Sequence, residues 1–286
     1  MLILVKAASW TAVAALAGVG LGRYWLAPER PRPVLAAALA ALSLVVLGAV
    51  ELWLTLAQVI GSVDLATWWR YAVRTGHGHA VFWRSAAALG LAGATLWLPR
   101  RWWPVAAALG LWLCYGFSRL SHAAALAGTG PLLVDLVHLV GAALWAGGVW
   151  RVALARGGPG VAEVERLSRL ALWVVVSLAL TGVVSGLVHA SEPERFLASG
   201  YAVALGVKLS LVAAALGLAA VNRFVLLPRA RRGRGGLRAA VWAESAVLLG
   251  VLVVTGWLTT SPVPHGAVVE VDVVENLRRL VELLAR

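Results

Sequence analysis

The stretch SRLSHAAALAGTGPLLVDLVHLVGAALWAGGVWR, residues 118–151, indicates both the fold class and the place to look for a site. Its apolar part is long enough to cross a bilayer, which takes about 20 residues of helix. Asp135 and His138 lie within that part, and His122 lies at the end of the preceding apolar run. Ionisable side chains at membrane depth are costly, and proteins keep them where they pair, bind an ion or carry protons. The stretch therefore predicts a membrane helix that carries a polar site.

The composition of the whole chain is that of a membrane protein. Its 286 residues are 61% hydrophobic and 13% charged, whereas a soluble domain has about 25% charged residues. The formal net charge is +12, but the Arg residues lie in short links between apolar runs. We therefore attribute this charge to membrane orientation and not to nucleic-acid binding. The one Cys, Cys114, excludes an internal disulfide and a CxxC metal site.

Eight apolar runs, each close to the length of a membrane span, follow one another along the chain. They cover residues 2–22, 34–58, 80–98, 103–121, 132–152, 168–190, 200–226 and 237–259. We predict an all-α, polytopic transmembrane bundle of about eight spans, with residues 1–264 forming a single unit. Residues 265–286 continue as a charged, partly amphipathic tail, which we expect to form a short helix along the outer surface.

The Arg residues are distributed unevenly between the links, and this predicts an orientation. Links after the odd-numbered runs carry most of them, so these links should be cytoplasmic and both termini extracytoplasmic. All six histidines then fall on the outer half of the molecule: His77, His79, His122, His138, His189 and His265. Imidazole suits copper, zinc and haem iron. An outward-facing group of histidines is what capture of a metal from an extracytoplasmic compartment requires.

The spacing within the run 132–152 points to one helix face. Asp135 and His138 are three residues apart and share that face, and Trp145 lies on the same stripe as a candidate cofactor contact. Because lipid would penalise Asp135, the stripe should face the bundle. The carboxylate can hold one imidazole nitrogen and leave the other to bind a metal ion. A purely structural hydrogen bond that ties this helix to a neighbour is the alternative.

These positions define the candidate metal site. We expect His122, His138 and His189 to be the ligands, and Asp135 to orient a ligand imidazole through a hydrogen bond. His77 and His79 form an H-x-H pair between Gly76 and Gly78. Such a pair can bind metal, but a flexible surface loop is the simpler interpretation.

Three further ionisable residues, Lys208, Arg223 and Glu244, lie within the last two apolar runs. Lys208 is at about the depth of His138, where it could pair with Glu51 or hold an anionic group of a haem or quinone. Glu244 and Arg223 lie near the opposite ends of their runs, and we interpret them as an ion pair at the inner face.

The second half of the chain resembles a known family. It has the pattern D-x-x-H-x6-W-x-G-G at 135–148, a Lys within the run 200–226, Asn-Arg at 222–223 and a Glu early in the last run. Over residues 115–264 these features are similar to the copper-resistance protein D (CopD) family of bacterial inner-membrane proteins. Helices before this region resemble the family mainly in hydropathy. The resemblance implies movement of copper inward across the inner (plasma) membrane, beside periplasmic copper-binding partners.

Two functions stay open at this point. In the first, the protein is a copper transport or delivery protein, transporter-like and not an enzyme, that takes copper from the periplasmic side through the His/Asp site. In the second, it is a haem b redox protein that exchanges electrons with a quinone or a periplasmic metal. Two of the same histidines would then be axial ligands, and Lys208 would hold a propionate. Related membrane families hold haem b with histidines on similar helices. The copper hypothesis lacks the sulfur ligands that Cu⁺ prefers.

Overall fold

The computed structural model describes residues 1–121, 129–189 and 199–261, and this part of the chain consists of helices joined by short links. Each of the eight apolar runs lies on a long helix. These helices are α1 (Leu2–Leu21), α2 (Val34–Ile60), α4 (Gly76–Trp97), α5 (Trp103–Ser118), α7 (Thr129–Ala153), α8 (Val161–His189), α10 (Gly200–Val221) and α12 (Leu237–Leu258). The all-α prediction is therefore confirmed. The shorter elements are η1 (Gly22–Leu26), α3 (Leu65–Arg74), η2 (Arg100–Trp102), η3 (Asn222–Leu226) and α11 (Leu227–Arg231).

Six helical segments of the described chain are long and apolar enough to cross a membrane. They are Leu2–Leu26, Val34–Ile60, Thr129–Ala153, Val161–Gly186, Gly200–Arg231 and Leu237–Leu258. The other two predicted spans, α4 and α5, fall outside this set. Helix α5 has 16 residues, which is about 24 Å of helix at 1.5 Å per residue. Helix α4 carries Arg84 in its interior. The predicted surface helix at 265–286 lies outside the described residues.

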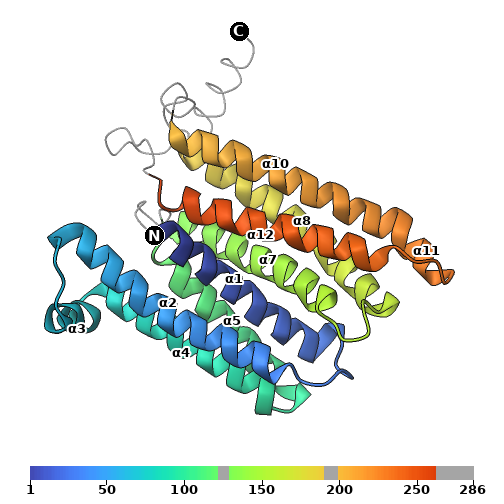
Figure 1. Ribbon diagram of the computed structural model, residues 1–286, viewed down its shortest axis with the longest axis horizontal. Helices are drawn as coiled ribbons and strands as arrows, with labels where there is room; N and C mark the ends of the chain where they lie inside the picture. The colour runs from blue at the N-terminus through green and yellow to red at the C-terminus, as the bar shows by residue number, and fades with distance from the viewer. Residues whose placement is uncertain (122–128, 190–198, 262–286) are drawn as a thin grey trace, which may run out of the picture.

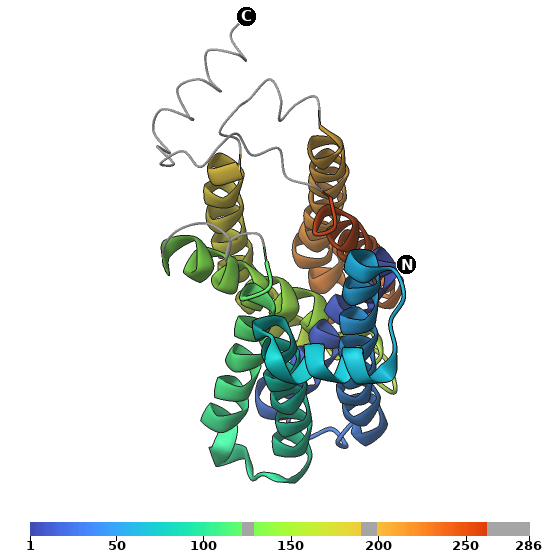
Figure 2. The ribbon, with the colours of Figure 1, turned by 90° about the vertical axis from the view of Figure 1, so that its left-hand side faces the viewer.

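Helices α1 and α7 form the centre of the bundle (Figure 1). Helices α2, α4 and α5 lie on one side of this pair, and α8, α10 and α12 lie on the other. Figure 2 shows α8 and α10 as two separate columns, because α8 packs against α7 whereas α10 packs against α12. The buried apolar residues accordingly form two clusters, one on each side of the central pair.

Glycine allows the two central helices to touch through their backbones. A Cβ atom placed on Gly18 of α1 would collide with the carbonyl oxygen of Gly147 on α7. A Cβ atom on Gly147 would in turn collide with the carbonyl oxygen of Ala14. Small residues permit such close approach between membrane helices. This contact fixes the position of α7, which carries Asp135 and His138 of the predicted site.

The Arg-rich links meet at one end of the bundle. Arg30, before α2, forms an ion pair with Glu163 in the first turn of α8. Arg166 donates to the backbone carbonyl of Leu26 at the end of η1, at 2.9 Å. Both contacts join the first half of the chain to the second half. Helices α4 and α7, which carry His77, His79 and His138 in their first three turns, begin at the opposite end (Figure 1).

Candidate functional site

His138 of α7 is held by a hydroxyl group from the neighbouring helix α8. Its Nδ1 atom lies 2.9 Å from the Oγ1 atom of Thr181. Thr181 has a single hydroxyl proton, and its Oγ1 also lies 2.7 Å from the carbonyl oxygen of Ser177, which accepts that proton. The hydroxyl oxygen must therefore accept from Nδ1–H of His138. In the neutral imidazole, which is the form that binds a metal ion, the lone pair is then on Nε2.

Asp135 faces a different neighbour from His138. Its carboxylate accepts a hydrogen bond of 2.7 Å from the hydroxyl of Ser118, the last residue of α5. Ser118 is fully buried, and its hydroxyl also lies 3.2 Å from the carbonyl oxygen of Leu132. In place of the predicted hydrogen bond to Asp135, the imidazole of His138 donates to the hydroxyl oxygen of Thr181. The reason is that α7 lies between α5 and α8. Asp135 and His138 are three residues apart on α7, and the first contacts α5 whereas the second contacts α8.

Lys208 of α10 is the third ionisable residue in this region. Its ammonium group lies within electrostatic range of the Asp135 carboxylate and of the His138 ring. The suggested pairing of Lys208 with Glu51 is wrong, since Glu51 of α2 forms an ion pair with Arg84 of α4. Helix α2 lies on the far side of α1 from α10, which keeps the two residues apart.

The remaining two proposed ligands cannot be placed around His138. His122 and the side chain of His189, at the end of α8, lie outside the described residues, as does His265. Within the described ranges no three His, Cys, Asp or Glu residues gather closely enough to hold a metal ion. The three-histidine centre therefore stays a prediction.

His77 and His79 belong to the first turn of α4 and not to a surface loop. Thr75 caps this helix, with its hydroxyl accepting from the backbone N–H of Gly78 at 3.0 Å. Residues two apart on a helix point in different directions. His79 Nε2 accordingly lies 2.8 Å from the carbonyl oxygen of Val73, whereas His77 faces the bundle. The H-x-H pair has separate partners.

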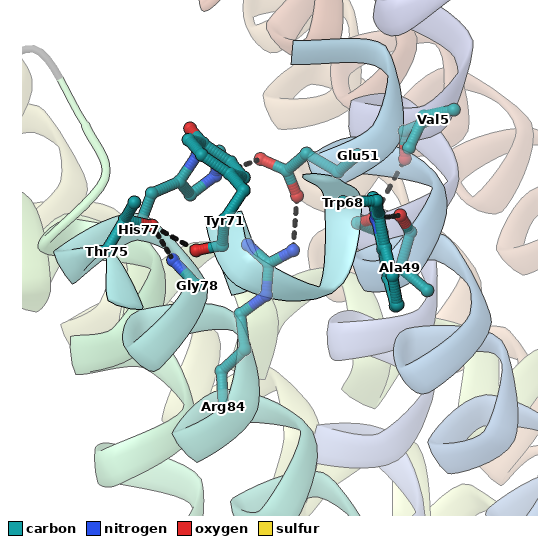
Figure 3. Close-up of polar contacts among 10 residues, drawn as sticks. Val5, Ala49, Glu51, Trp68, Tyr71, Thr75, His77, Gly78 and Arg84 are labelled. Carbon is teal, nitrogen blue, oxygen red and sulfur yellow. Dashed lines mark hydrogen bonds and ion pairs between the residues drawn. The ribbon is translucent and has the colours of Figure 1, made fainter. Parts of the chain in front are cut away.

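His77 takes part in a buried polar cluster, which Figure 3 shows around Glu51. Its Nδ1 lies 2.9 Å from the hydroxyl of Tyr71 on α3, and its Nε2 lies 3.8 Å from Oε1 of Glu51. Burial and the nearby Glu51 carboxylate raise the pKa of the Tyr71 hydroxyl. Arg84, which is 1% exposed, donates to the other oxygen of Glu51.

Arg84 was missed by the sequence reasoning. Its guanidinium lies 4.4 Å from the centre of the Phe117 ring and lines a cavity of about 90 Å³ with Lys6 and Trp10. An Arg within an apolar run is the same signal that drew attention to Asp135, and it was available in the sequence.

Trp145, predicted as a cofactor contact, donates to a carboxylate. Its Nε1 lies 3.2 Å from Oε1 of Glu244 on α12, and Nδ2 of Asn222 lies 2.7 Å from Oε2. Arg223 does not pair with Glu244 as predicted, because it donates to the backbone and the hydroxyl of Ser168, at 2.7 and 2.8 Å. These residues line a cavity of about 160 Å³ between α7, α8, α10 and α12.

Two family models match the chain. The model of the copper resistance protein D-like N-terminal domain matches residues 1–132, and the copper resistance protein D model matches residues 161–258. The first match extends the resemblance to the half of the chain where only the hydropathy had suggested it. No curated protein and no solved structure gives a significant match. The chain belongs to the copper resistance protein D family, bacterial multi-pass membrane proteins involved in copper resistance.

Proposed function

We propose that the protein takes copper at the outer face of the membrane and passes it inward between the helices of its second half. In this proposal the chain crosses the inner membrane about eight times, and both termini lie outside the cytoplasm. The outer ends of α7, α8 and α10 then face the compartment from which copper arrives. Copper is the cargo, and a periplasmic copper-binding protein is the partner that delivers it.

The observation that supports this proposal best is the hydrogen-bond chain from Ser177 through Thr181 to His138. It fixes the tautomer of a neutral imidazole and leaves Nε2 as its metal-binding atom. His122 and His189 are the further ligands that we propose. Asp135 contributes negative charge close by, which lowers the cost of bringing a cation to membrane depth.

The haem b alternative receives less support from the same geometry. It needs a cation to hold a propionate, and Lys208 was the residue proposed for that role. Asp135 lies within electrostatic reach of Lys208 and offsets its positive charge. This balance removes the preference for an incoming carboxylate that Lys208 alone would give.

A matched pair of threonine variants tests the proposal. Thr181→Val removes the acceptor for Nδ1–H of His138, and we expect copper affinity to fall by about 10-fold, the lower end of the range for such supporting residues. Thr255→Val is the control, because Thr255 makes the same intrahelical hydrogen bond, to Val251 at 2.7 Å, but makes none to His138. The measurement is equilibrium competition with a chelator on purified protein, done separately with Cu⁺ and Cu²⁺.

Three outcomes would contradict the proposal. Unchanged copper affinity in His138→Ala would remove the site altogether. Equal weakening in the two threonine variants would show a general packing effect. A Soret band that shifts on reduction and is lost in His138→Ala would establish the haem alternative.

A further inference from the structure

Glu244 is a buried carboxyl group whose hydrogen-bond partners are neutral. It is 5% exposed and accepts hydrogen bonds from the indole of Trp145 and the amide of Asn222. Glu51, the other buried glutamate in the described part of the chain, differs because Arg84 pairs with it. A carboxylate that is taken out of water without a cation carries a large free-energy cost. Glu244 can gain a proton without breaking an ion pair, whereas Glu51 cannot.

The charged groups on the surrounding elements have other partners or lie on the surface. Arg151 on α7 is near Glu163, Arg166 on α8 donates to Leu26, and Arg223 on η3 donates to Ser168. Lys208 on α10 interacts with Asp135, and Arg169 and Arg238 are exposed. Of these, Arg223 also lines the cavity beside Glu244. A fixed cation on the wall disfavours binding of a second metal ion there.

Asn222 offers the carboxyl group an acceptor as well as a donor. The residue is 5% exposed, and its Oδ1 atom is buried without a hydrogen-bond partner in the described part of the chain. Unpaired buried oxygens are uncommon and call for an explanation. A protonated Glu244 needs an acceptor for its O–H group, and rotation of the Asn222 amide brings Oδ1 into that position. Asn222 can thus serve both states of the carboxyl group.

The backbone at Asn222 is also unusual. The residue begins η3, a π-helical turn that interrupts the helical run between α10 and α11. Such turns are rare and occur frequently at functional sites. Here the turn brings Asn222 against α12 at the wall of the cavity of about 160 Å³.

We propose that Glu244 and Asn222 form a proton-binding site that opens into this cavity. A hydronium ion in the cavity gives its proton to the carboxylate oxygen of Glu244, leaving water and a neutral carboxylic acid, and release reverses the step. No electron is transferred. Trp145 holds the second carboxylate oxygen in both states. Buried carboxyl groups in this arrangement are the usual proton carriers of pumps and transporters.

The position of the site suggests what the proton does, and this step rests on the proposed function. Trp145 and His138 are seven residues apart on α7, about 10 Å along the helix axis. The proton site is therefore in the half of the bundle nearer the Arg-rich links. A proton that leaves or enters Glu244 would compensate the charge of copper moving through the same helices.

Infrared difference spectroscopy of the purified protein tests the site without reference to copper. On acidification we expect the carbonyl band of a protonated, buried carboxylic acid, with a downward shift in protein labelled with ¹³C at its Glu carboxyl groups. Glu244→Gln should abolish the band. Glu165→Gln, at a surface ion pair with Arg231, should keep it. Absence of the band at every pH where the protein stays folded, or its persistence in Glu244→Gln, would overturn the proposal.

Two further measurements test the assignment of the band to Glu244 and its coupling to copper. If Glu244→Gln does not fold, Trp145→Phe removes one hydrogen bond to the carboxyl group and should move the same ¹³C-sensitive band. A band that shifts with neither the label nor this variant would belong to another group and would overturn the assignment. Copper uptake into liposomes then tests the coupling: Glu244→Gln should bind copper normally but lose the effect of a pH gradient on the rate. Failure of uptake in the natural protein would contradict the proposed function and leave the infrared result standing.

Discussion

Gly147→Ala should destabilise the bundle by about 2–3 kcal/mol, toward the upper end of the usual cost of overpacking. The added Cβ would lie 2.6 Å from the backbone nitrogen of Gly18 and closer still to the carbonyl oxygen of Ala14. Ordinary contacts begin near 3.4 Å, and a helix backbone cannot move aside as a flexible side chain does. Helices α1 and α7 must therefore separate by roughly 1 Å, which forfeits a quarter to a half of the dispersion energy along their contact.

The assay is reversible unfolding of the purified protein in mixed micelles, with Gly217→Ala as the control. Gly217 lies on α10, and a Cβ there would have no atom within 4 Å. We expect this control to cause no loss of stability and to gain up to about 1 kcal/mol from the higher helix propensity of Ala. If the two variants unfold alike, the helices do not touch through their backbones at Gly147, and the central position given to α7 is wrong.

Two other predictions concern the first half of the chain. Arg84→Met should lower the free energy of unfolding by about 3–5 kcal/mol, because it leaves the Glu51 carboxylate buried without its cation. In the same unfolding assay, the double variant Arg84→Met/Glu51→Met should recover most of this loss. A double variant whose loss equals the sum of the two single losses would contradict the prediction. Hydrogen bonds from the backbone N–H and hydroxyl of Thr67 lower the pKa of Asp64, which caps α3. The contribution of the Asp64 carboxylate to the stability of α3 is complete above the ordinary pKa of Asp, and it is lost as the pH falls through the lowered pKa of Asp64. Amide hydrogen exchange, corrected for intrinsic rates, should show that α3 frays only in acid in the natural chain but at every pH in Asp64→Ala. If exchange in α3 of the natural chain does not depend on pH, Asp64 does not cap the helix.

The long helices could be predicted because their signal is local. A run of about 20 apolar residues must satisfy its backbone groups internally, and a helix does so within the run itself. Helix α3 was not predicted because it has only ten residues and mixes apolar with charged side chains, so that it does not form a long apolar run. Its signals were present: Asp64 is a helix-capping residue, and Leu65, Trp69 and Val73 recur every four residues.

The partners of the polar residues could not be predicted in the same way. Spacing shows that Asp135 and His138 share a face of α7, but it does not show which helices cover that face. Ser118 and Thr181 decide where the two side chains bond, and each lies far away in the sequence. Helix neighbours depend on packing across the whole bundle, which no single run encodes.

Helix α7 is the element on which the functional argument depends, and the family match does not cover it fully. The two matched ranges end at residue 132 and begin again at residue 161, so His138 and Trp145 lie between them. Membership of the family therefore establishes the class of protein without assigning either residue. Their roles rest on geometry: α8 orients the imidazole at one end, and the indole holds a buried carboxyl group about two turns away. Both contacts are made from one helix against separate neighbours, so α7 is the element that connects a shift of α8 to a shift of α12. Coupling of copper to a proton requires that the state of one site change the free energy of the other, and α7 is the direct link between the two sites.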